Sequence, residues 1–197
     1  MNSQLQPSLA GYLLTGGKSS RMGADKAFLN FDGRTLLDRA IAVMRDICSE
    51  VAVVGDSAKF ATYGTVITDI YPGCGPLAGI HAALRQSSAE LNLMLAVDMP
   101  FVTRELLSFL FAAANESDAI VAVPRTAGGF QPLCAVYRRA FAPAAEKALG
   151  AGNYKIDAVF RGITVRVIEE EELTRAGFSE HLFFNVNTPD DLRTAKK

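Results

Sequence analysis

Short apolar runs alternate along the chain with longer segments in which apolar residues recur every three or four positions. Uninterrupted runs of Val, Ile, Leu and Ala are typical of strands that are buried on both faces of a parallel sheet. The strands expected from these runs are 9–14, 51–54, 66–68, 92–97, 119–123, 133–137, 163–168 and 183–186.

The segments between these runs have helical spacing. We expect helices over 35–48, 76–85, 103–115 and 139–149, and a last one beginning at Thr188. Thr35 and Asp38 have the spacing of a capping pair at a helix start, and Pro76 suits a first helical turn. The alternation of strands and helices predicts an α/β fold, a single-domain doubly wound sheet that is mostly parallel. We expect this domain to span 9–197, after a flexible N-terminal segment over 1–8.

Composition and charge narrow the class of protein. The 197 residues are 49% apolar, which is enough for a globular core. A net charge of −1 gives no general attraction to nucleic acid or to an anionic membrane. The three cysteines lack a zinc-binding spacing, no apolar run approaches the roughly 20 residues of a membrane span, and the start lacks a signal-peptide pattern. We therefore expect a cytoplasmic protein that binds neither nucleic acid nor membrane.

The segment that follows the first expected strand is rich in glycine, hydroxyl and cationic residues. Gly16 and Gly17 allow backbone amides to approach a polyphosphate, and Arg21 and Lys26 can add full positive charges. A Walker loop is excluded because Tyr12 stands where its first glycine is required. The alternative is a solvated surface loop. We expect a phosphate-binding loop.

Two further polar positions follow expected strands. Asp98 comes directly after 92–97, and Asn187 directly after 183–186. Ligands of doubly wound sheets bind outside the carboxyl ends of the strands, so we expect the glycine loop, Asp98 and Asn187 to form one site. A carboxylate there can bind a hard cation such as Mg²⁺ that bridges phosphates. The alternative for Asp98 is a cap on the turn before Pro100.

In this order, and over nearly the whole chain, the motifs resemble those of the molybdenum cofactor guanylyltransferases, a branch of the Rossmann-like nucleotidyltransferases. The resembling segments are 14–17, 20–26, 75–80, 98–101, 131–133 and 185–192. The Gly-Gly form of the loop and the Asn-Val-Asn-Thr-Pro segment favour this branch. The resemblance implies transfer of GMP from GTP to the terminal phosphate of molybdopterin, release of pyrophosphate, and Mg²⁺ as cofactor.

The resemblance also implies roles for individual residues. Those implied to bind GTP are Leu14, Thr15, Gly16, Gly17, Lys26, Asp69 and Asp98. Those implied to act in catalysis are Arg21, Lys26 and Asp98, with Asp98 also binding the metal. Those implied to bind the acceptor are Gln131, Asn185 and Asn187. Because the glycine loop and Asn187 follow the first and last expected strands, we expect Lys26 and Asn187 to serve different substrates.

Several alternatives stay open. The chain departs from some relatives at Gly55-Asp56, where those relatives carry an asparagine that contacts the nucleotide. The competing activities are a cytidylyltransferase acting on the same cofactor and a sugar-phosphate nucleotidyltransferase. A non-catalytic nucleotide-binding module is the third alternative, and the presence of Lys26 and Asp98 argues against it. The partners implied are GTP, molybdopterin, and proteins that deliver or receive the cofactor.

Overall fold

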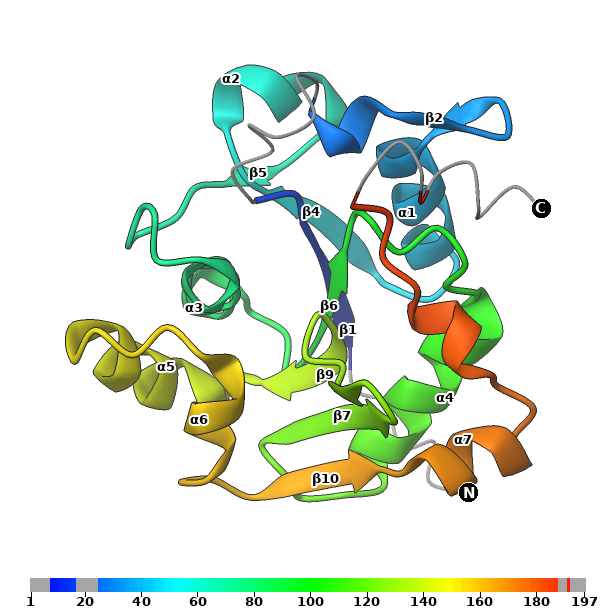
Figure 1. Cartoon of the computed structure of the whole chain (residues 1–197). Helices are drawn as coiled ribbons and strands as arrows, with labels where there is room; N and C mark the ends of the chain where they lie inside the picture. Colours follow the sequence, from blue (N-terminus) through cyan, green and yellow to red (C-terminus); the bar gives the residue numbers. More distant parts are fainter. Residues whose placement is uncertain (1–7, 17–24, 188–190, 192–197) are drawn as a thin grey trace, which may run out of the picture.

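The centre of the molecule is a twisted sheet (Figure 1). The computed structural model describes residues 8–16, 25–187 and 191. Its strand order is β10-β7-β9-β6-β1-β4-β5, and β8 pairs with β7. The strands are β1 (Leu9–Leu14), β4 (Glu50–Val54), β5 (Val66–Ile67), β6 (Leu91–Ala96), β7 (Val121–Thr126), β8 (Gly129–Phe130), β9 (Cys134–Arg138) and β10 (Val165–Ile168).

The sheet is mostly parallel, as the apolar runs predict. β1 pairs in parallel with both β4 and β6, β4 with β5, and β10 with β7. β9 is the exception in the main path, because it runs antiparallel to both of its neighbours, β6 and β7. The fold is therefore the expected α/β arrangement with a mostly parallel sheet, in which β9 and the short β8 are reversed.

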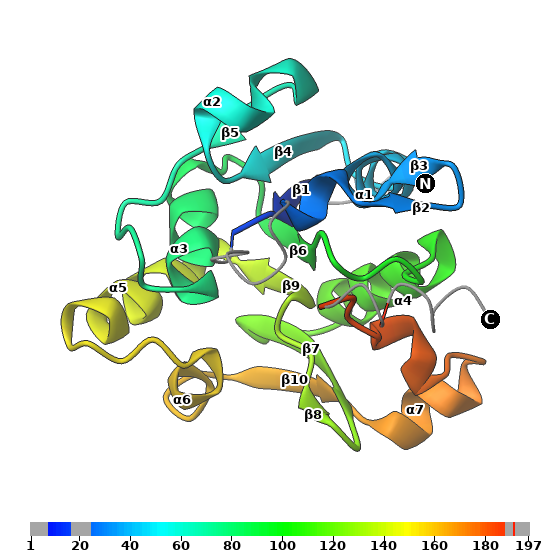
Figure 2. The ribbon, with the colours of Figure 1, turned by 45° about the horizontal axis from the view of Figure 1, so that its top comes forward.

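Helices cover both faces of the sheet (Figures 1 and 2). One face packs against α1 (Leu36–Arg45), α4 (Arg104–Asn115) and α7 (Glu170–Arg175). The other packs against α3 (Pro76–Gln86), α5 (Ala142–Gly150) and α6 (Ile156–Phe160), while the short α2 (Ser57–Phe60) follows β4. Each face has its own apolar core, so the central strands are buried on both sides. No helix in the described part of the chain has the length and apolar character needed to cross a membrane.

The helix starts follow from their sequences. The Thr35 hydroxyl accepts a hydrogen bond from Asp38 N at 3.0 Å at the start of α1, which is the expected capping interaction. Pro76 stands in the first turn of α3, where its missing N–H leaves no hydrogen bond unmade. Thr103 caps α4 in the same way as Thr35 caps α1.

The connections create a switch point beside β1. From β1 the chain crosses one face through α1 to reach β4, and from β5 it crosses the opposite face through α3 to reach β6 on the other side of β1. The crevice at such a reversal, outside the carboxyl ends of the strands, is the usual ligand site of a doubly wound sheet. The segments that follow β1 and β6 border this crevice.

One expected strand is absent, and one hairpin was not expected. The run 183–186 is not a strand: Phe183 ends a short 3-10 helix, Glu180–Phe183, and Val186 donates one backbone hydrogen bond to Asp98 O at 2.8 Å. Phe183 and Val186 are apolar because they are buried, not because they pair in the sheet. The sequence reading also missed a hairpin, β2 (Asn30–Phe31) and β3 (Arg34–Thr35), whose turn is Asp32-Gly33 with both φ angles positive.

Candidate active site

Lys26 and Asp98 stand on opposite sides of the switch point. Lys26 begins a 3-10 helix, Lys26–Phe28, that is capped by Asp25, whose carboxylate accepts from Ala27 N at 3.2 Å. The other Asp25 oxygen is 3.1 Å from Lys59 Nζ, so Asp25 orients Lys59 and not Lys26. Asp98 lies just beyond β6, where Val97 N still donates to Leu14 O of β1 at 3.1 Å. The backbone of the sheet thus fixes the position of Asp98.

The Lys26 ammonium group joins three segments of the chain. Its Nζ lies 3.4 Å from Asp98 Oδ2 and donates to Asn187 Oδ1 at 2.6 Å. The contact between Val186 N and Asp98 O brings Asn187 to this position, and Asp191 Oδ2 accepts from Asn187 N at 2.8 Å. The expected convergence of Lys26, Asp98 and Asn187 is therefore observed. This contact does not test whether Lys26 and Asn187 serve different substrates, but it means that a change at Asn187 also reaches the Lys26 ammonium.

Burial and charge oppose each other at Asp98. Its side chain is only 20% exposed, and this burial is the main influence on its carboxyl and raises its pKa. The neighbouring Lys26 ammonium lowers that pKa by charge and by hydrogen bonding, without fully offsetting the effect of burial. A carboxylate held in this way gains from any further positive charge, which is a suitable setting for a divalent cation.

The opposite side of β1 is formed by the ends of β4 and β5. Thr15 donates from its hydroxyl to Val54 O at 2.8 Å and from its backbone N to the same oxygen at 3.1 Å. Asp69 follows β5 and is exposed overall, yet the chain around its carboxyl desolvates it enough to raise its pKa. Thr15 and Asp69 therefore lie at the carboxyl ends of the strands, on the side of β1 away from Asp98.

Two glycines at this rim have opposite surroundings. A Cβ added at Gly16 would meet no atom of the described residues within 4 Å, and Gly16 is exposed. A Cβ added at Gly55 would lie 2.2 Å from Thr15 Oγ1 and 3.1 Å from the Phe60 ring. The fold therefore requires a glycine at 55 but not at 16, so the absence of a side chain at 16 leaves space that a ligand can use.

The remaining expected residues divide into three groups. The Leu14 side chain is buried, so only its backbone can face a ligand. Gln131 donates from Nε2 to Thr126 Oγ1 at 3.2 Å, and Asn185 donates from Nδ2 to Phe183 O at 3.2 Å. Within the described part of the chain, neither side chain forms a hydrogen bond with Lys26 or Asp98. Gly17, Arg21 and the expected cap at Thr188 lie outside the described residues.

The donor set for a metal is small. Within residues 8–16, 25–187 and 191 no three His, Cys, Asp or Glu side chains gather closely enough to hold a metal ion by themselves. Asp98 offers one carboxylate. Mg²⁺ commonly uses one or two carboxylates and takes its other ligands from substrate phosphates and water. The site fits a metal that arrives with a nucleotide better than a permanent metal centre.

A comparison with known families decides the class of protein. The family model described as the MobA-like NTP transferase domain matches residues 11–169. The chain belongs to this family. Within the MobA-like family, it is similar to the probable molybdenum cofactor guanylyltransferase of Pelotomaculum thermopropionicum, with 36% identity over 94% of this chain and 91% of that protein. It is also 32% identical to the molybdenum cofactor guanylyltransferase of Desulfosudis oleivorans, over 96% and 95% of the two chains.

Two solved structures have the same fold. The molybdopterin-guanine dinucleotide biosynthesis protein A of Archaeoglobus fulgidus superposes with a TM-score of 0.83, at 28% identity over 95% of this chain and 96% of that one. The 2-C-methyl-D-erythritol 4-phosphate cytidylyltransferase of Thermus thermophilus superposes with a TM-score of 0.68 at 24% identity, over 94% and 96%. The second likeness supports the Rossmann-like nucleotidyltransferase fold alone. The resemblance inferred from the sequence motifs is thus confirmed at the level of family and fold.

The sequence reading did not identify two features of the site. One is the backbone contact from Val186 to Asp98, which carries the C-terminal segment to the crevice. The other is the carboxylate of Asp191, which holds the backbone N–H of Asn187. Asp191 had a signal in the sequence, since it closely follows the Asn-Val-Asn-Thr-Pro motif.

Proposed function

We propose that this chain transfers GMP from GTP to the terminal phosphate of molybdopterin and releases pyrophosphate. The observation that carries the proposal is the cluster of Lys26, Asp98 and Asn187 at the switch point of a MobA-like fold. The names of relatives that match over more than nine-tenths of this chain support the choice of substrates. A cytoplasmic location, and proteins that deliver or receive the cofactor, stay predictions from the sequence.

The residues act by binding and by neutralising charge. Lys26 presents an ammonium group that can contact the triphosphate and stabilise the charge that builds up at the α-phosphorus. Asn187 holds this group through a 2.6 Å hydrogen bond, which limits its movement before the nucleotide arrives. A phosphate acceptor is already an anion at neutral pH, so attack requires no protein base. Arg21 is proposed to bind the departing pyrophosphate.

The proposed metal is Mg²⁺, with Asp98 as its protein ligand. When bound with the nucleotide, the metal would supply charge neutralisation at the phosphates. Asp98 would hold it at the end of β6, and the Lys26 ammonium 3.4 Å from Asp98 Oδ2 would share the phosphate oxygens. The use of a divalent metal is common to phosphoryl and nucleotidyl transfer, because several negative charges meet at one phosphorus.

The choice of guanine over other bases rests on the glycine loop. The open space at Gly16 allows a purine or a phosphate to approach the backbone closely. Gly55 cannot be replaced by a larger residue without moving Thr15, so the end of β4 offers backbone and not side-chain contacts to a nucleotide. Comparing the turnover of GTP with that of CTP will distinguish this guanylyltransferase proposal from the cytidylyltransferase alternative.

The direct test is a panel of GTP, CTP, ATP and UTP with molybdopterin and Mg²⁺, followed by pyrophosphate release. We expect GTP to be used in preference to the other three. Equal turnover of CTP would remove the guanine assignment and leave the nucleotidyltransferase class. Binding of GTP without any pyrophosphate release, in the presence of active acceptor, would favour the non-catalytic module.

A further inference from the structure

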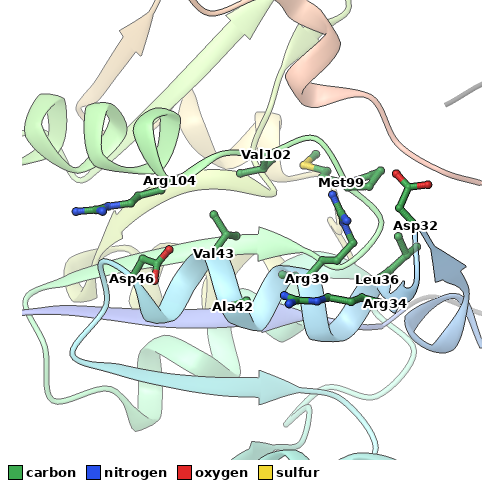
Figure 3. Close-up of a pocket in the computed structure, with 12 residues that line it drawn as sticks. Asp32, Arg34, Leu36, Arg39, Ala42, Val43, Asp46, Met99, Val102 and Arg104 are labelled. Carbon is green, nitrogen blue, oxygen red and sulfur yellow. The ribbon is translucent and has the colours of Figure 1, made fainter. Parts of the chain in front are cut away.

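A second cavity lies beside the active site and has no part in the chemistry proposed above. It has a volume of about 450 Å³ and lies between α1 and the segment that leads from β6 to α4, with the β2–β3 hairpin at one end (Figure 3). Neither Lys26, Asp98 nor Asn187 lines it. One wall, however, is formed by Met99 and Pro100, the two residues that directly follow Asp98.

The lining of this cavity combines apolar and charged residues. Leu36, Val43, Met99 and Val102 contribute apolar surface. The charged groups around them are Asp32, Arg34, Arg39, Asp46 and Arg104, which give an excess of one positive charge. None of these five forms an ion pair with any residue in the described part of the chain. The guanidinium groups of Arg34, Arg39 and Arg104 can therefore each pair with an anionic ligand.

Arg39 is the most informative of the three. Its side chain rises from α1 toward Met99, as Figure 3 shows. Its guanidinium carbon lies 5.0 Å from the centroid of the Phe31 ring, so the group is packed and not extended into solvent. Its Nε is sheltered from solvent and donates to no acceptor among the described residues. A sheltered donor of this kind is costly unless an acceptor is present, and an oxyanion bound in the cavity would supply that acceptor.

We infer that this cavity binds a small organic oxyanion, a carboxylate or phosphate group carried on an apolar body. The guanidinium of Arg39 receives the oxyanion, and its planar donor arrangement suits both head groups. The apolar side chains of the lining receive the body of the ligand, and the volume is in the usual range for small-molecule sites. Asp32 and Asp46 disfavour long polyanions such as nucleic acid, because they place negative charge at both ends of the rim.

The position of the cavity places such a ligand next to the turn that carries Asp98. A molecule that fills it contacts the turn carrying Asp98 without entering the crevice that holds Lys26. Binding should therefore be compatible with a bound nucleotide.

The test is calorimetric titration of the full chain, saturated with GTP and Mg²⁺, with phenyl phosphate and with phenylacetate. Benzylamine, which has the same ring and the opposite charge, is the control ligand. We expect at least one of the two anions to bind and benzylamine not to bind, and the comparison of the two anions identifies the preferred head group. Failure of both anions to bind to the GTP-saturated chain, or equal binding of benzylamine, would overturn the inference.

Variants then assign the binding to this cavity. Arg39→Gln should weaken the bound anion about tenfold or more, since a charged hydrogen bond is lost. Arg45→Gln is the matched control, because it removes a guanidinium from the same helix outside the cavity and should change nothing. If Arg39→Gln does not fold, Ala42→Glu tests the same point, because Ala42 is exposed and a carboxylate there should repel the anion. Unchanged affinity in the folded Arg39→Gln or Ala42→Glu protein would overturn the inference.

Discussion

Replacing Lys26 by Met should change the acidity of Asp98. The substitution keeps the length of the side chain and removes the ammonium that lies 3.4 Å from Asp98 Oδ2. Burial raises the pKa of Asp98 and Lys26 lowers it, so loss of Lys26 leaves the effect of burial unopposed. The carboxyl should then take up its proton at higher pH than in the unchanged protein.

The size of the change follows from the separation and the exposure. Two unit charges at 3.4 Å interact by about 1 kcal/mol in a fully aqueous medium and by about 5 kcal/mol at an effective dielectric of about 20. Both side chains keep about a fifth of their surface exposed, so solvent screening favours the lower part of this range. We expect the proton affinity of Asp98 to rise by about tenfold, which corresponds to roughly 1.4 kcal/mol.

Carbon NMR of the Asp98 carboxyl, titrated with acid in the absence of metal, measures this directly. The pH dependence of the residual pyrophosphate release should move the same way, with activity lost at higher pH as acid is added. Lys59→Met is the control, because Lys59 pairs with Asp25 near the rim and not with Asp98. A titration midpoint for Asp98 that stays in place or falls in Lys26→Met would refute the reasoning.

Five other substitutions, at four residues, test separate parts of the site. Gly16→Ala should leave the melting temperature unchanged and weaken GTP binding, whereas Gly55→Ala should cost about 1–3 kcal/mol of stability through its clash with Thr15. A lower melting temperature with normal GTP binding in Gly16→Ala, and an unchanged melting temperature in Gly55→Ala, would contradict these roles of the two glycines. Asp98→Asn should lower turnover by about 10²–10³-fold and keep the fold, and near-normal Mg²⁺-dependent turnover would leave Asp98 as a turn cap. Asn187→Ala should weaken GTP binding as well as the use of molybdopterin, because it releases the Lys26 ammonium. Asn187→Asp should weaken GTP binding more, because it adds a carboxylate beside the same ammonium. Unchanged GTP affinity of both variants in calorimetric titration would exclude a role of Asn187 in holding Lys26.

The sequence predicted an element well where its apolar run has a single explanation, namely a strand buried on both faces. The run 9–14 became β1 because every one of its residues is buried between two layers of helices. The run 183–186 looks similar, yet it is apolar because Phe183 and Val186 fill the core beside β6 without a free strand edge to pair with. Apolar runs report burial, and burial alone does not distinguish a strand from an irregular buried segment.

The sequence predicted which strand ends form the site, but not every contact between the side chains there. Lys26 and Asp98 could be placed together because both follow strands whose carboxyl ends meet at the switch point. The contact of Lys26 with Asn187 could not, since these residues are 161 positions apart and meet only through the backbone bond from Val186 to Asp98. The Asp32-Gly33 hairpin had a clear sequence signal and was overlooked, and with it one end of the second cavity.

The central claim is the transfer of a guanylyl group, and the fate of the GTP phosphates tests it most directly. GTP labelled at the α-phosphate, and in a second reaction at the γ-phosphate, is incubated with the chain, Mg²⁺ and molybdopterin. The account predicts that the α-label joins the molybdopterin product and that the γ-label is released in pyrophosphate. Recovery of the γ-label on molybdopterin, or of the α-label only in free GMP or GDP, would contradict it.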